Sequence, residues 1–516
     1  MMRNVIIRGV SIVLFLFAWE SIAKAYPDSF VVAGPVAIIG YIDAHQTLLG
    51  RALAATFSSA AWGFLWGNLA AVCMAILVIL VPKSQRIMSA LALVLFCLPL
   101  VATGPILRVL YGPGDGPQIT LAALAVYYTT YLALLVGLRS IPQSWSDLNR
   151  IYGQGAISEL IHIRAMASIP YLIAGLQIAA PAAFLGAMIG EFTGSERGIG
   201  VLILRAMLGL DAVATWTLAV MSASVTMVAY GLFSIIGRLL GFAPALLLNP
   251  PVARVSRSWI TQLVSVTFVT VLVLLIWHIV MEAFELNPFF AKRPGDVWSY
   301  LFLSDKGPSA RMTLADAITQ TLTFALPGYF AGLILGAGLA ALLILAPIFA
   351  TTVLPVAVAL RSVPIIATAP LIVLALGRGA TGTIAIVAVM TFFPTLVACL
   401  QGLRQTPGQV NDVFNSYAAG RMRFLLWARI PVMLPAFFAA ARMAVPAAVL
   451  AVTTTEWLAT GKGIGHLMAL TATTSNYNML WSAIVALSIV AVAGYAAIAA
   501  IERVVLRIYA SDQAIS

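Results

Sequence analysis

Long apolar segments recur along the whole chain, and they restrict its fold more than any other feature. Many of them are about 20 residues long, the length that a helix needs to cross the hydrocarbon core of a bilayer. Because lipid cannot hydrogen-bond to the backbone, such segments must form helices. A transmembrane barrel would show segments of about ten residues with alternating polarity, and none appear. The predicted fold class is therefore all-α, a polytopic membrane protein.

Composition agrees with this class. Of the 516 residues, 62% are hydrophobic and 9% are charged, whereas about a quarter of a soluble chain is charged. The net charge of +11 fits Lys and Arg in cytoplasmic loops, which set orientation and meet anionic lipid, better than nucleic-acid binding. The three cysteines lie in apolar segments without a Cys-x-x-Cys spacing, so we expect neither a disulfide nor a metal site.

The second half of the chain repeats the first at a fixed shift of 265 residues, over about 51–240 and 316–505. Examples of identical residues in this register are Gly63 and Gly328, Glu191 and Glu456, and Trp216 and Trp481. Six helices in each copy predict two parallel repeats with the same membrane orientation. We therefore expect about 12 transmembrane helices. The first repeat is 1–240, the second is 259–516, and a basic cytoplasmic linker at 241–258 joins them.

Apolar segments also place the helices within a repeat. In the first repeat they lie at about 5–23, 53–81, 87–110, 119–138, 169–190 and 212–236. We interpret 5–23 as a retained signal anchor in preference to a cleaved signal peptide, and 26–50 as an external segment. Lys and Arg are more frequent in the loops assigned to the inner side, which places both termini in the cytoplasm.

One polar segment interrupts the apolar pattern in each copy. It reads Asp-Leu-Asn-Arg-Ile-Tyr-Gly-Gln-Gly at 147–155 and Asp-Val-Phe-Asn-Ser-Tyr-Ala-Ala-Gly at 412–420, and we expect Pro170 and Pro435 to open the helices that follow. An amphipathic helix on the membrane surface would account for such a segment. A contact with a soluble protein would also explain the two copies. The residues expected at this contact are Asp147, Tyr152, Gly153, Gly155, Asp412, Tyr417, Ala418 and Gly420.

These segments resemble the cytoplasmic signature of inner-membrane permease subunits of ATP-binding-cassette (ABC) importers, which reads Glu-Ala-Ala, three residues, then Gly. Asp147 and Asp412 stand at the Glu position, while Gly153 and Ala418 stand at the Gly position. The pattern Pro-x-x-Ala-Thr-x-Pro at 99–105 and 364–370 is similar to the nitrate, sulfonate and taurine branch of this family. Glu191 with the later Gly-Ile-Gly at 198–200, and Glu456 with the later Gly-Ile-Gly at 463–465, are similar to the same branch. A fusion of two permease units departs from the family's usual single unit.

The resemblance implies the type I ABC importer permease fold, in which the two polar segments are coupling helices that bind two ATPase subunits. It also implies an external solute-binding protein, a small anionic solute and a bacterial inner membrane. The chain has no Walker-type sequence, so we expect it not to be an enzyme and to bind no cofactor, with ATP and Mg²⁺ used by the partner ATPases. The alternative is an ion-coupled secondary transporter with two parallel repeats, although few ionisable residues lie in mid-span.

The same resemblance and the membrane context suggest further site residues. The candidates for lining the pathway are Pro99, Thr103, Pro105, Pro364, Thr368 and Pro370, with kinked helices that only pack as the alternative. Arg442, whose counterpart is Gln177, either attracts an anionic solute or bonds helix ends near the cytoplasm. Glu191 and Glu456 either contact the external protein or cap local turns. The solute stays open among nitrate, sulfonates, bicarbonate and aromatic or pyrimidine precursors.

Overall fold

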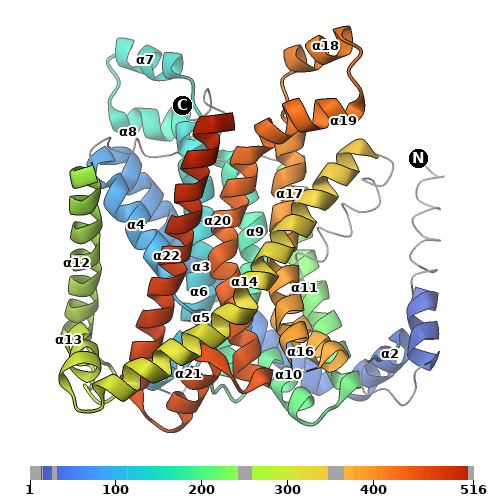
Figure 1. The fold of residues 1–516 in the computed structure, drawn as a ribbon, viewed down its shortest axis with the longest axis vertical. Coiled ribbons are helices and arrows are strands. Elements are labelled where there is room, and N and C mark those ends of the chain that lie inside the picture. The colour runs from blue at the N-terminus through green and yellow to red at the C-terminus, as the bar shows by residue number, and fades with distance from the viewer. Residues whose placement is uncertain are drawn as a thin grey trace.

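The computed structural model describes residues 13, 16–25, 32–112, 114–241, 259–346, 365–377 and 379–509. Figure 1 shows long helices that cross the molecule, two helical hairpins that project from one end, and several short helices at the other end. The described residues contain no strand, so the all-α prediction is confirmed for them.

The helices of the two repeats follow the same order. In the first repeat they are α2 (Pro35–Ala44), α3 (Gln46–Leu80), α4 (Gln85–Phe96), α5 (Leu100–Tyr111), α6 (Gly116–Arg139), α7 (Gln143–Ile151), α8 (Ala156–Glu159), α9 (Ala165–Phe192), α10 (Ile199–Leu208) and α11 (Ala212–Leu239). In the second they are α12 (Trp259–Ala283), α13 (Pro294–Trp298), α14 (Gly307–Leu345), α16 (Ile365–Leu376), α17 (Ala380–Arg404), α18 (Gly408–Ser416), α19 (Arg421–Phe424), α20 (Ile430–Thr455), α21 (Gly463–Thr473) and α22 (Tyr477–Tyr509). Short π-helical turns follow α8, α13, α19 and α20, at Leu160–Arg164, Ser299–Leu303, Leu425–Arg429 and Glu456–Thr460.

The number of long helices agrees with a polytopic protein. Within the described part of the chain, 9 helices are long and apolar enough to cross a membrane, and a bent pair that includes α4 and α5 makes 10 if it counts as one span. Two further expected helices, at 5–23 and at the second-repeat counterpart of α4, fall at least partly outside the described residues, as does most of the expected linker at 241–258.

The expectation of a single helix at 87–110 is wrong, because the chain bends by 90° between α4 and α5. Pro99 lies at the break, as the extended N-cap of α5 with a ψ of 99°. Proline lacks an N–H and disfavours a helical conformation of the residue before it, so one helix ends at Phe96 and the next begins at Leu100. Pro99 therefore marks a break between two helices.

Two other boundaries differ from the expectation. α2 and the start of α3 lie within the expected external segment 26–50, where Pro35 fills the first turn of α2 and its missing N–H costs nothing. The expected helix at 169–190 begins earlier, because helical structure is continuous over Ala156–Phe192. Pro170 therefore lies inside this helix instead of opening it, which membrane-spanning helices tolerate.

Close packing within each repeat depends on small residues. α6 contacts both α3 and α9, and α17 contacts α14 and α20 in the same way. A Cβ at Gly63 of α3 would collide with Ala122 of α6, and a Cβ at Gly328 of α14 would collide with Val387 of α17. Helices in lipid associate through close contact that small residues permit, so these matched glycines have a packing role.

One helix of each repeat lies at the interface with the other repeat. α5 contacts α6 and α9 of its own repeat and also α20, α21 and α22 of the second, while its counterpart α16 contacts α17 and α20 of its own repeat and also α9, α10 and α11 of the first. Ala102 and Ile106 of α5 enter a core with Ile464 of α21, and Ala369 of α16 enters a core with Ala183 of α9. α5 and α16 therefore join the two repeats, and we call them the interface helices.

The duplication extends beyond the register found in the sequence. Trp216 and Trp481 are equivalent, and each packs on a tryptophan from the helix that begins its own repeat. The ring centroids of Trp19 and Trp216 are 5.4 Å apart, and those of Trp277 and Trp481 are 5.3 Å apart. Because Trp19 and Trp277 are 258 residues apart, a comparison at 265 misses this pair.

Candidate functional site

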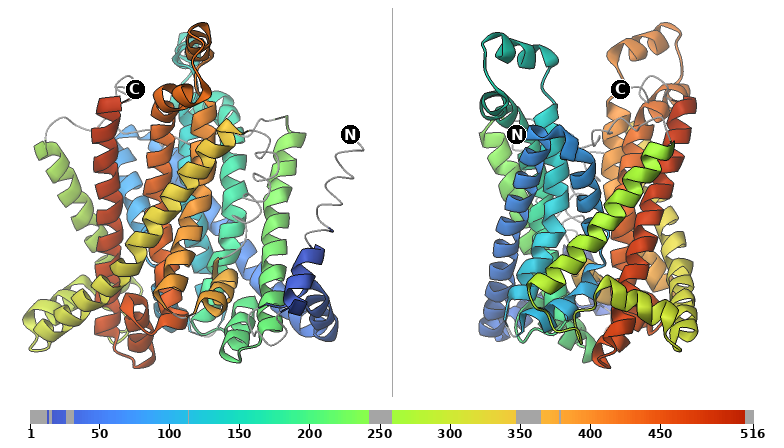
Figure 2. Two further views of the ribbon diagram at one scale, coloured as in Figure 1. Left: turned by 45° about the vertical axis from the view of Figure 1, so that its right-hand side comes forward. Right: turned by 90° about the vertical axis from the view of Figure 1, so that its left-hand side faces the viewer.

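Two helical hairpins project from the same end of the bundle (Figures 1 and 2). α7 and α8 form the first hairpin, α18 and α19 form the second, and these carry the polar segments 147–155 and 412–420. In each hairpin the chain leaves the bundle along one short helix, turns, and returns into a long helix, α9 or α20. The structure thus places both polar segments at one end of the molecule.

The turn of each hairpin holds a left-handed residue. Gly153 has a φ of +69°, and its equivalent Ala418 has a φ of +48°. A residue with a Cβ is strained in this region by about 1–2 kcal/mol, so the second hairpin keeps the conformation at an energetic cost. Gly155 and Gly420 are instead N-caps of α8 and α19 with negative φ. A Cβ at any of the three glycines would meet nothing within 4 Å, so the surface around them is open.

Large apolar side chains are exposed on both hairpins. Tyr152 is 73% exposed, and its equivalent Tyr417 is 82% exposed. The other members are Trp145, Leu148, Ile151, Ile157 and Ile161 in the first hairpin and Val413, Met422, Leu426 and Trp427 in the second. We call these two sets the docking faces. Asp147 and Asp412 are exposed beside them, and exposed apolar patches flanked by polar residues are typical of protein contact sites.

The first hairpin is braced by a buried carboxylate. Glu159 Oε1 accepts hydrogen bonds from Ser146 Oγ of α7 at 2.8 Å and from Arg164 Nε and Nη2 at 2.9 Å and 2.6 Å. Arg164 Nη1 also donates to the carbonyl of Leu138, near the end of α6, at 2.8 Å. Hydrogen bonds between charged groups are short and strong, so this network fixes how the first hairpin projects.

Aromatic contacts replace this brace in the second hairpin. Phe424 stands at the position of Glu159, and its ring centroid lies 5.1 Å from that of Phe414 in α18. Arg429, the equivalent of Arg164, lies 4.7 Å from the centroid of the Phe424 ring. Sequence reasoning missed both braces. The available signal was the arginine common to both copies, whose partner changes from an acid to a phenyl ring.

The described pathway candidates lie in or beside α5 and α16, the interface helices. Pro99 caps α5, Pro105 lies within it, and Thr103 Oγ1 donates to a carbonyl of its own helix at 2.9 Å. In the second repeat, Pro364 lies outside the described residues and the other two candidates fall within α16. α5 and α16 both contact the opposite repeat, and the role of these residues in lining a pathway stays a prediction.

Arg442 of α20 forms a buried ion pair with Glu502 of α22. The distance from Arg442 Nη1 to Glu502 Oε2 is 3.0 Å, and the side chains are 13% and 11% exposed. The guanidinium also lies 5.9 Å from the centroid of the Tyr495 ring. Neither of the roles expected for Arg442 included a carboxylate partner. The first repeat has no such pair, since Gln177 and Gly237 stand at the equivalent positions.

Glu191 and Glu456 are buried, at 3% and 0% exposure, so their side chains do not form an exposed contact site. Glu191 Oε1 accepts a hydrogen bond from Thr56 Oγ1 of α3 at 2.6 Å, and Oε2 accepts one from the Gly200 N–H of α10 at 2.7 Å. Thr56 Oγ1 in turn accepts from the Ile199 N–H at 2.8 Å. Of the two expected roles, capping of a local turn is the one that these bonds show.

The second repeat joins the equivalent residues, with both bonds to the carboxylate made to one of its oxygens. Glu456 Oε2 accepts from Thr321 Oγ1 at 3.0 Å and from the Gly465 N–H at 2.8 Å, and Thr321 Oγ1 accepts from the Ile464 N–H at 2.9 Å. We call these two networks the outer clasps. Their members are Thr56, Glu191, Ile199 and Gly200 in the first repeat and Thr321, Glu456, Ile464 and Gly465 in the second.

A further glycine lies beside each carboxylate of the outer clasps. Gly198 has a φ of +123° and Gly463 a φ of +86°, a region that other residues rarely adopt. A Cβ at either position would collide with the carboxylate of Glu191 or Glu456. The Gly-Ile-Gly pattern after each Glu therefore lets the carboxylate reach the start of α10 or α21.

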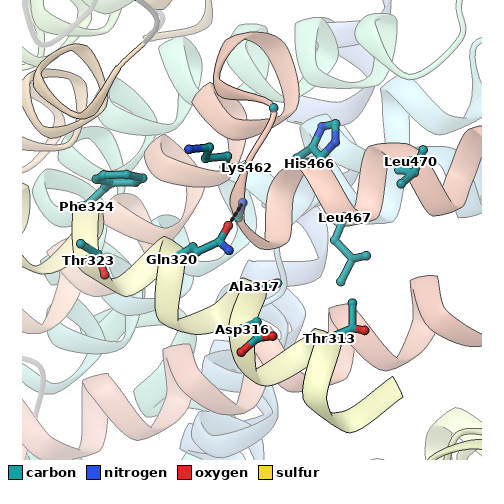
Figure 3. A pocket seen from close by; sticks show the side chains of 12 residues that line it. Thr313, Asp316, Ala317, Gln320, Thr323, Phe324, Lys462, His466, Leu467 and Leu470 are labelled. Carbon is teal, nitrogen blue, oxygen red and sulfur yellow. Dashed lines mark hydrogen bonds between the residues drawn. The ribbon is translucent and has the colours of Figure 1, made fainter. Parts of the chain in front are cut away.

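A pocket of about 600 Å³ lies beside the second outer clasp (Figure 3). Asp316 and Gln320 line it from α14, and Lys462 and His466 line it from the α21 side. Gln320 Oε1 also accepts a hydrogen bond from the Gly463 N–H at 3.1 Å. The first-repeat equivalents of Asp316, Gln320 and His466 are Arg51, Ala55 and Val201. Gln320 and His466 therefore give this pocket polar groups that the first repeat lacks at the same positions.

A helical bundle built from two parallel repeats, with one hairpin from each repeat exposed at the same end, is the architecture of a membrane permease. The chain belongs to the family described as binding-protein-dependent transport system inner membrane component, which matches residues 63–242 and again 328–508. The two matched stretches begin 265 residues apart, which confirms both the duplication and the fusion of two permease units.

Individual relatives match the chain one unit at a time. A probable ABC transporter permease protein of Haemophilus influenzae is 27% identical over 208 residues, which cover 83% of that protein and 40% of this chain. The formylaminopyrimidine transport permease protein ThiX of Halalkalibacterium halodurans is 32% identical over 62% of its length and 30% of this chain. The taurine transport system permease protein TauC of Escherichia coli is 25% identical over 79% of its length and 42% of this chain.

Proposed function

We propose that the chain forms the membrane pathway of an ABC importer and is driven by two separate ATPase subunits that bind the docking faces. The observation that carries this proposal is a pair of exposed apolar faces, on equivalent hairpins, at one end of a membrane-spanning bundle. Large exposed apolar patches are uncommon on a protein surface unless a partner covers them. Two copies of one face therefore indicate two copies of one kind of partner.

The hairpins are suited to pass on a movement of the ATPases. The helical stretches Ala156–Phe192 and Arg421–Leu458 begin at the docking faces and continue across the bundle. Movement of two ATPase subunits relative to each other would therefore displace the two repeats. Alternating access needs such a rearrangement of one repeat against the other around a central pathway. ATP and Mg²⁺ would act in the partner subunits, and this chain would convert their movement into transport without catalysing a reaction.

The family and its members suggest which class of solute crosses the membrane. Relatives are named as permeases for taurine, aliphatic sulfonates, nitrate and formylaminopyrimidine. We propose import of a small solute, with an anion as the first class to test, delivered by an external solute-binding protein. The docking faces would then be cytoplasmic, in a bacterial inner membrane. The end of α22 lies at that end of the bundle (Figure 1), so it would be cytoplasmic as well under this proposal.

Copurification tests this assignment. Tyr152→Asp and Tyr417→Asp place a charge at the most exposed ring of each docking face. We expect each single variant to weaken retention of the coexpressed ATPase on the tagged chain, and the double variant to abolish it, because truncating a central interface aromatic costs about 2 kcal/mol or more.

Leu210→Asp is a matched control at the other end of the bundle. Leu210 is exposed and left-handed, with a φ of +55°, a conformation that Asp tolerates better than most residues. This variant should retain the ATPase. Retention of both the ATPase and solute uptake by the Tyr152→Asp/Tyr417→Asp variant would show that the docking faces have been assigned wrongly.

A further inference from the structure

We infer that Glu191 and Glu456 are positioning residues, which hold the short helices α10 and α21 so that a movement at the docking faces reaches the opposite end of the bundle. The inference rests on the proposed function, since it presumes that the docking faces receive a movement. It assigns the outer clasps a role in transmission that is separate from ATPase binding and from solute recognition.

One long helix in each repeat connects the two ends of the molecule. Glu191 lies in the last turn of α9, within the continuous helical stretch Ala156–Phe192 that starts at the first docking face. Glu456 lies near the end of the equivalent stretch, Arg421–Leu458. Each carboxylate therefore stands at the far end of the helix that begins at a docking face.

Each carboxylate of the outer clasps joins three helices by hydrogen bonds. Through Thr56 and Gly200, Glu191 joins the end of α9 to α3 and to the first turn of α10. A carboxylate at a helix N-terminus is stabilised by the free N–H groups and the helix dipole. Since Gly198 leaves no room for a Cβ beside the carboxylate, the chain is also held sterically. α10 therefore follows any displacement of the end of α9.

The clasped helices contact the opposite repeat. α10 contacts α16 and α21 contacts α5, and each of these contacts joins one repeat to the other. α5 and α16 are the interface helices, and they carry the candidate pathway residues. The outer clasps thus connect the long helix of one repeat to the interface helix of the other.

The two repeats differ in the brace of the docking hairpins, in the ion pair of Arg442 and in the pocket beside α21. Both outer clasps nevertheless keep three hydrogen bonds between equivalent residues, although the carboxylate accepts on two oxygens in the first repeat and on one in the second. A role that both halves must perform accounts for the retention of these contacts.

Isosteric substitutions test the inference. Thr56→Val with Thr321→Val removes the hydroxyl that bonds each carboxylate and leaves the shape of the buried side chain nearly unchanged. Thr56→Ser with Thr321→Ser keeps the hydroxyl and should restore function. Thr391→Val is the matched control, because Thr391 is also fully buried, bonds only carbonyls of its own helix, and has Val126 as its counterpart in the first repeat.

Two distances between spin labels report on movement at the two ends of the bundle. One pair of spin labels replaces Ser140 and Gln405, exposed equivalents beside the docking hairpins, and the other replaces Leu208 and Thr473, exposed equivalents at the ends of α10 and α21. The labels are placed in the full complex with the ATPase, in a background where the exposed Cys73 is Ser. Both distances are measured with and without a non-hydrolysable ATP analogue.

In the wild-type background we expect both distances to change when nucleotide binds. In the Thr→Val double variant, the change at 140 and 405 should persist while the change at 208 and 473 is lost. Uptake should fall at least about fivefold, the lower range of measured coupling between sites, with basal ATP hydrolysis within about twofold of wild type. The serine variant and Thr391→Val should behave as wild type.

An unchanged response at 208 and 473 in the Thr→Val double variant would overturn the inference. So would the loss of both responses together with ATPase binding, or a failure of serine to restore the response, since each would make the threonines part of the fold alone. If wild type itself showed no change at 140 and 405, the proposed function would fail instead.

Discussion

Arg164 and Arg429 occupy the same position in the two repeats but hold their hairpins by different means. Arg164 donates two hydrogen bonds to the Glu159 carboxylate, at 2.9 Å and 2.6 Å, whereas Arg429 lies 4.7 Å from the centroid of the Phe424 ring. The equivalent guanidinium group contacts a carboxylate in one copy and the face of an aromatic ring in the other. The two hairpins are separate stretches of one chain, so each can have its own brace.

Glu159→Ala should destabilise the first hairpin, because it leaves a partly buried Arg164 without its carboxylate. Breaking a buried pair from one side costs about 3 kcal/mol or more. Asn149→Phe with Glu159→Phe transplants the aromatic brace, since Phe414 and Phe424 stand at these positions in the second repeat. We expect this double variant to regain most of the lost thermal stability and ATPase retention. A double variant no better than Glu159→Ala would show that the two braces are not interchangeable.

Ala418→Gly should stabilise the chain by about 1 kcal/mol, because glycine adopts the left-handed conformation without the strain of a Cβ. Gly153→Ala at the equivalent turn should destabilise by a similar amount. A Cβ at Gly153 meets nothing within 4 Å, so backbone conformation alone is being tested there. Thermal unfolding in detergent measures both effects. A shift of the same sign for the two variants would contradict the shared geometry of the turns.

Gly198→Ala and Gly463→Ala should each destabilise by about 2 kcal/mol or more, since the new Cβ meets the carboxylate of an outer clasp and the backbone is left-handed. Gly231→Ala in α11 is the control: its Cβ meets nothing within 4 Å, and alanine is the better helix former. The melting temperatures of the three variants, compared with that of wild type, measure these changes in stability. Equal stability of Gly198→Ala and wild type would show that the clasp is looser than its hydrogen bonds indicate.

Arg442→Gln should destabilise the chain by about 3–5 kcal/mol, because Glu502 is left buried without its partner. The double variant Arg442→Gln/Glu502→Gln removes both charges and should recover most of this loss. It should also keep uptake if the arginine acts only through the ion pair. Normal folding with loss of uptake would instead show that Arg442 contacts the solute, as one interpretation of the sequence proposed.

The membrane class and the duplication could be predicted from sequence because both depend on patterns that need no knowledge of contacts. Apolar length reports transfer into lipid, and a fixed register reports duplication. The break at Pro99 and the continuity of the helix through Pro170 were harder to predict. A proline in a membrane helix either kinks it or ends it, and the choice depends on neighbouring helices.

The site was predicted in part for a similar reason. The polar segments that form the hairpins stand out against apolar surroundings, so polarity alone located them. Glu502 was missed as a partner because it lies on another helix than Arg442, and only the fold brings them together. Glu159 was missed because it lies five residues before Arg164, outside the usual i, i+3 and i, i+4 pairs, and a π-helical turn brings the two side chains together. For Glu191 the sequence left two roles open, because a carboxylate at the end of an apolar segment fits either an exposed contact or the cap of a local turn. Gly198 and Gly200 fit the cap, since they let the chain approach the carboxylate closely.

The contacts of α5 and α16 with both repeats have a consequence for anyone who would divide or recombine this protein. A cut within 241–258 leaves each fragment with one helix that has lost its contacts with the other half. The side chains that α5 buries against α21, and α16 against α9, would then be uncovered, so we expect the two fragments to be more stable together than apart. A chimaera that replaces one repeat must therefore keep the surface of α5 or α16 compatible with the half that remains.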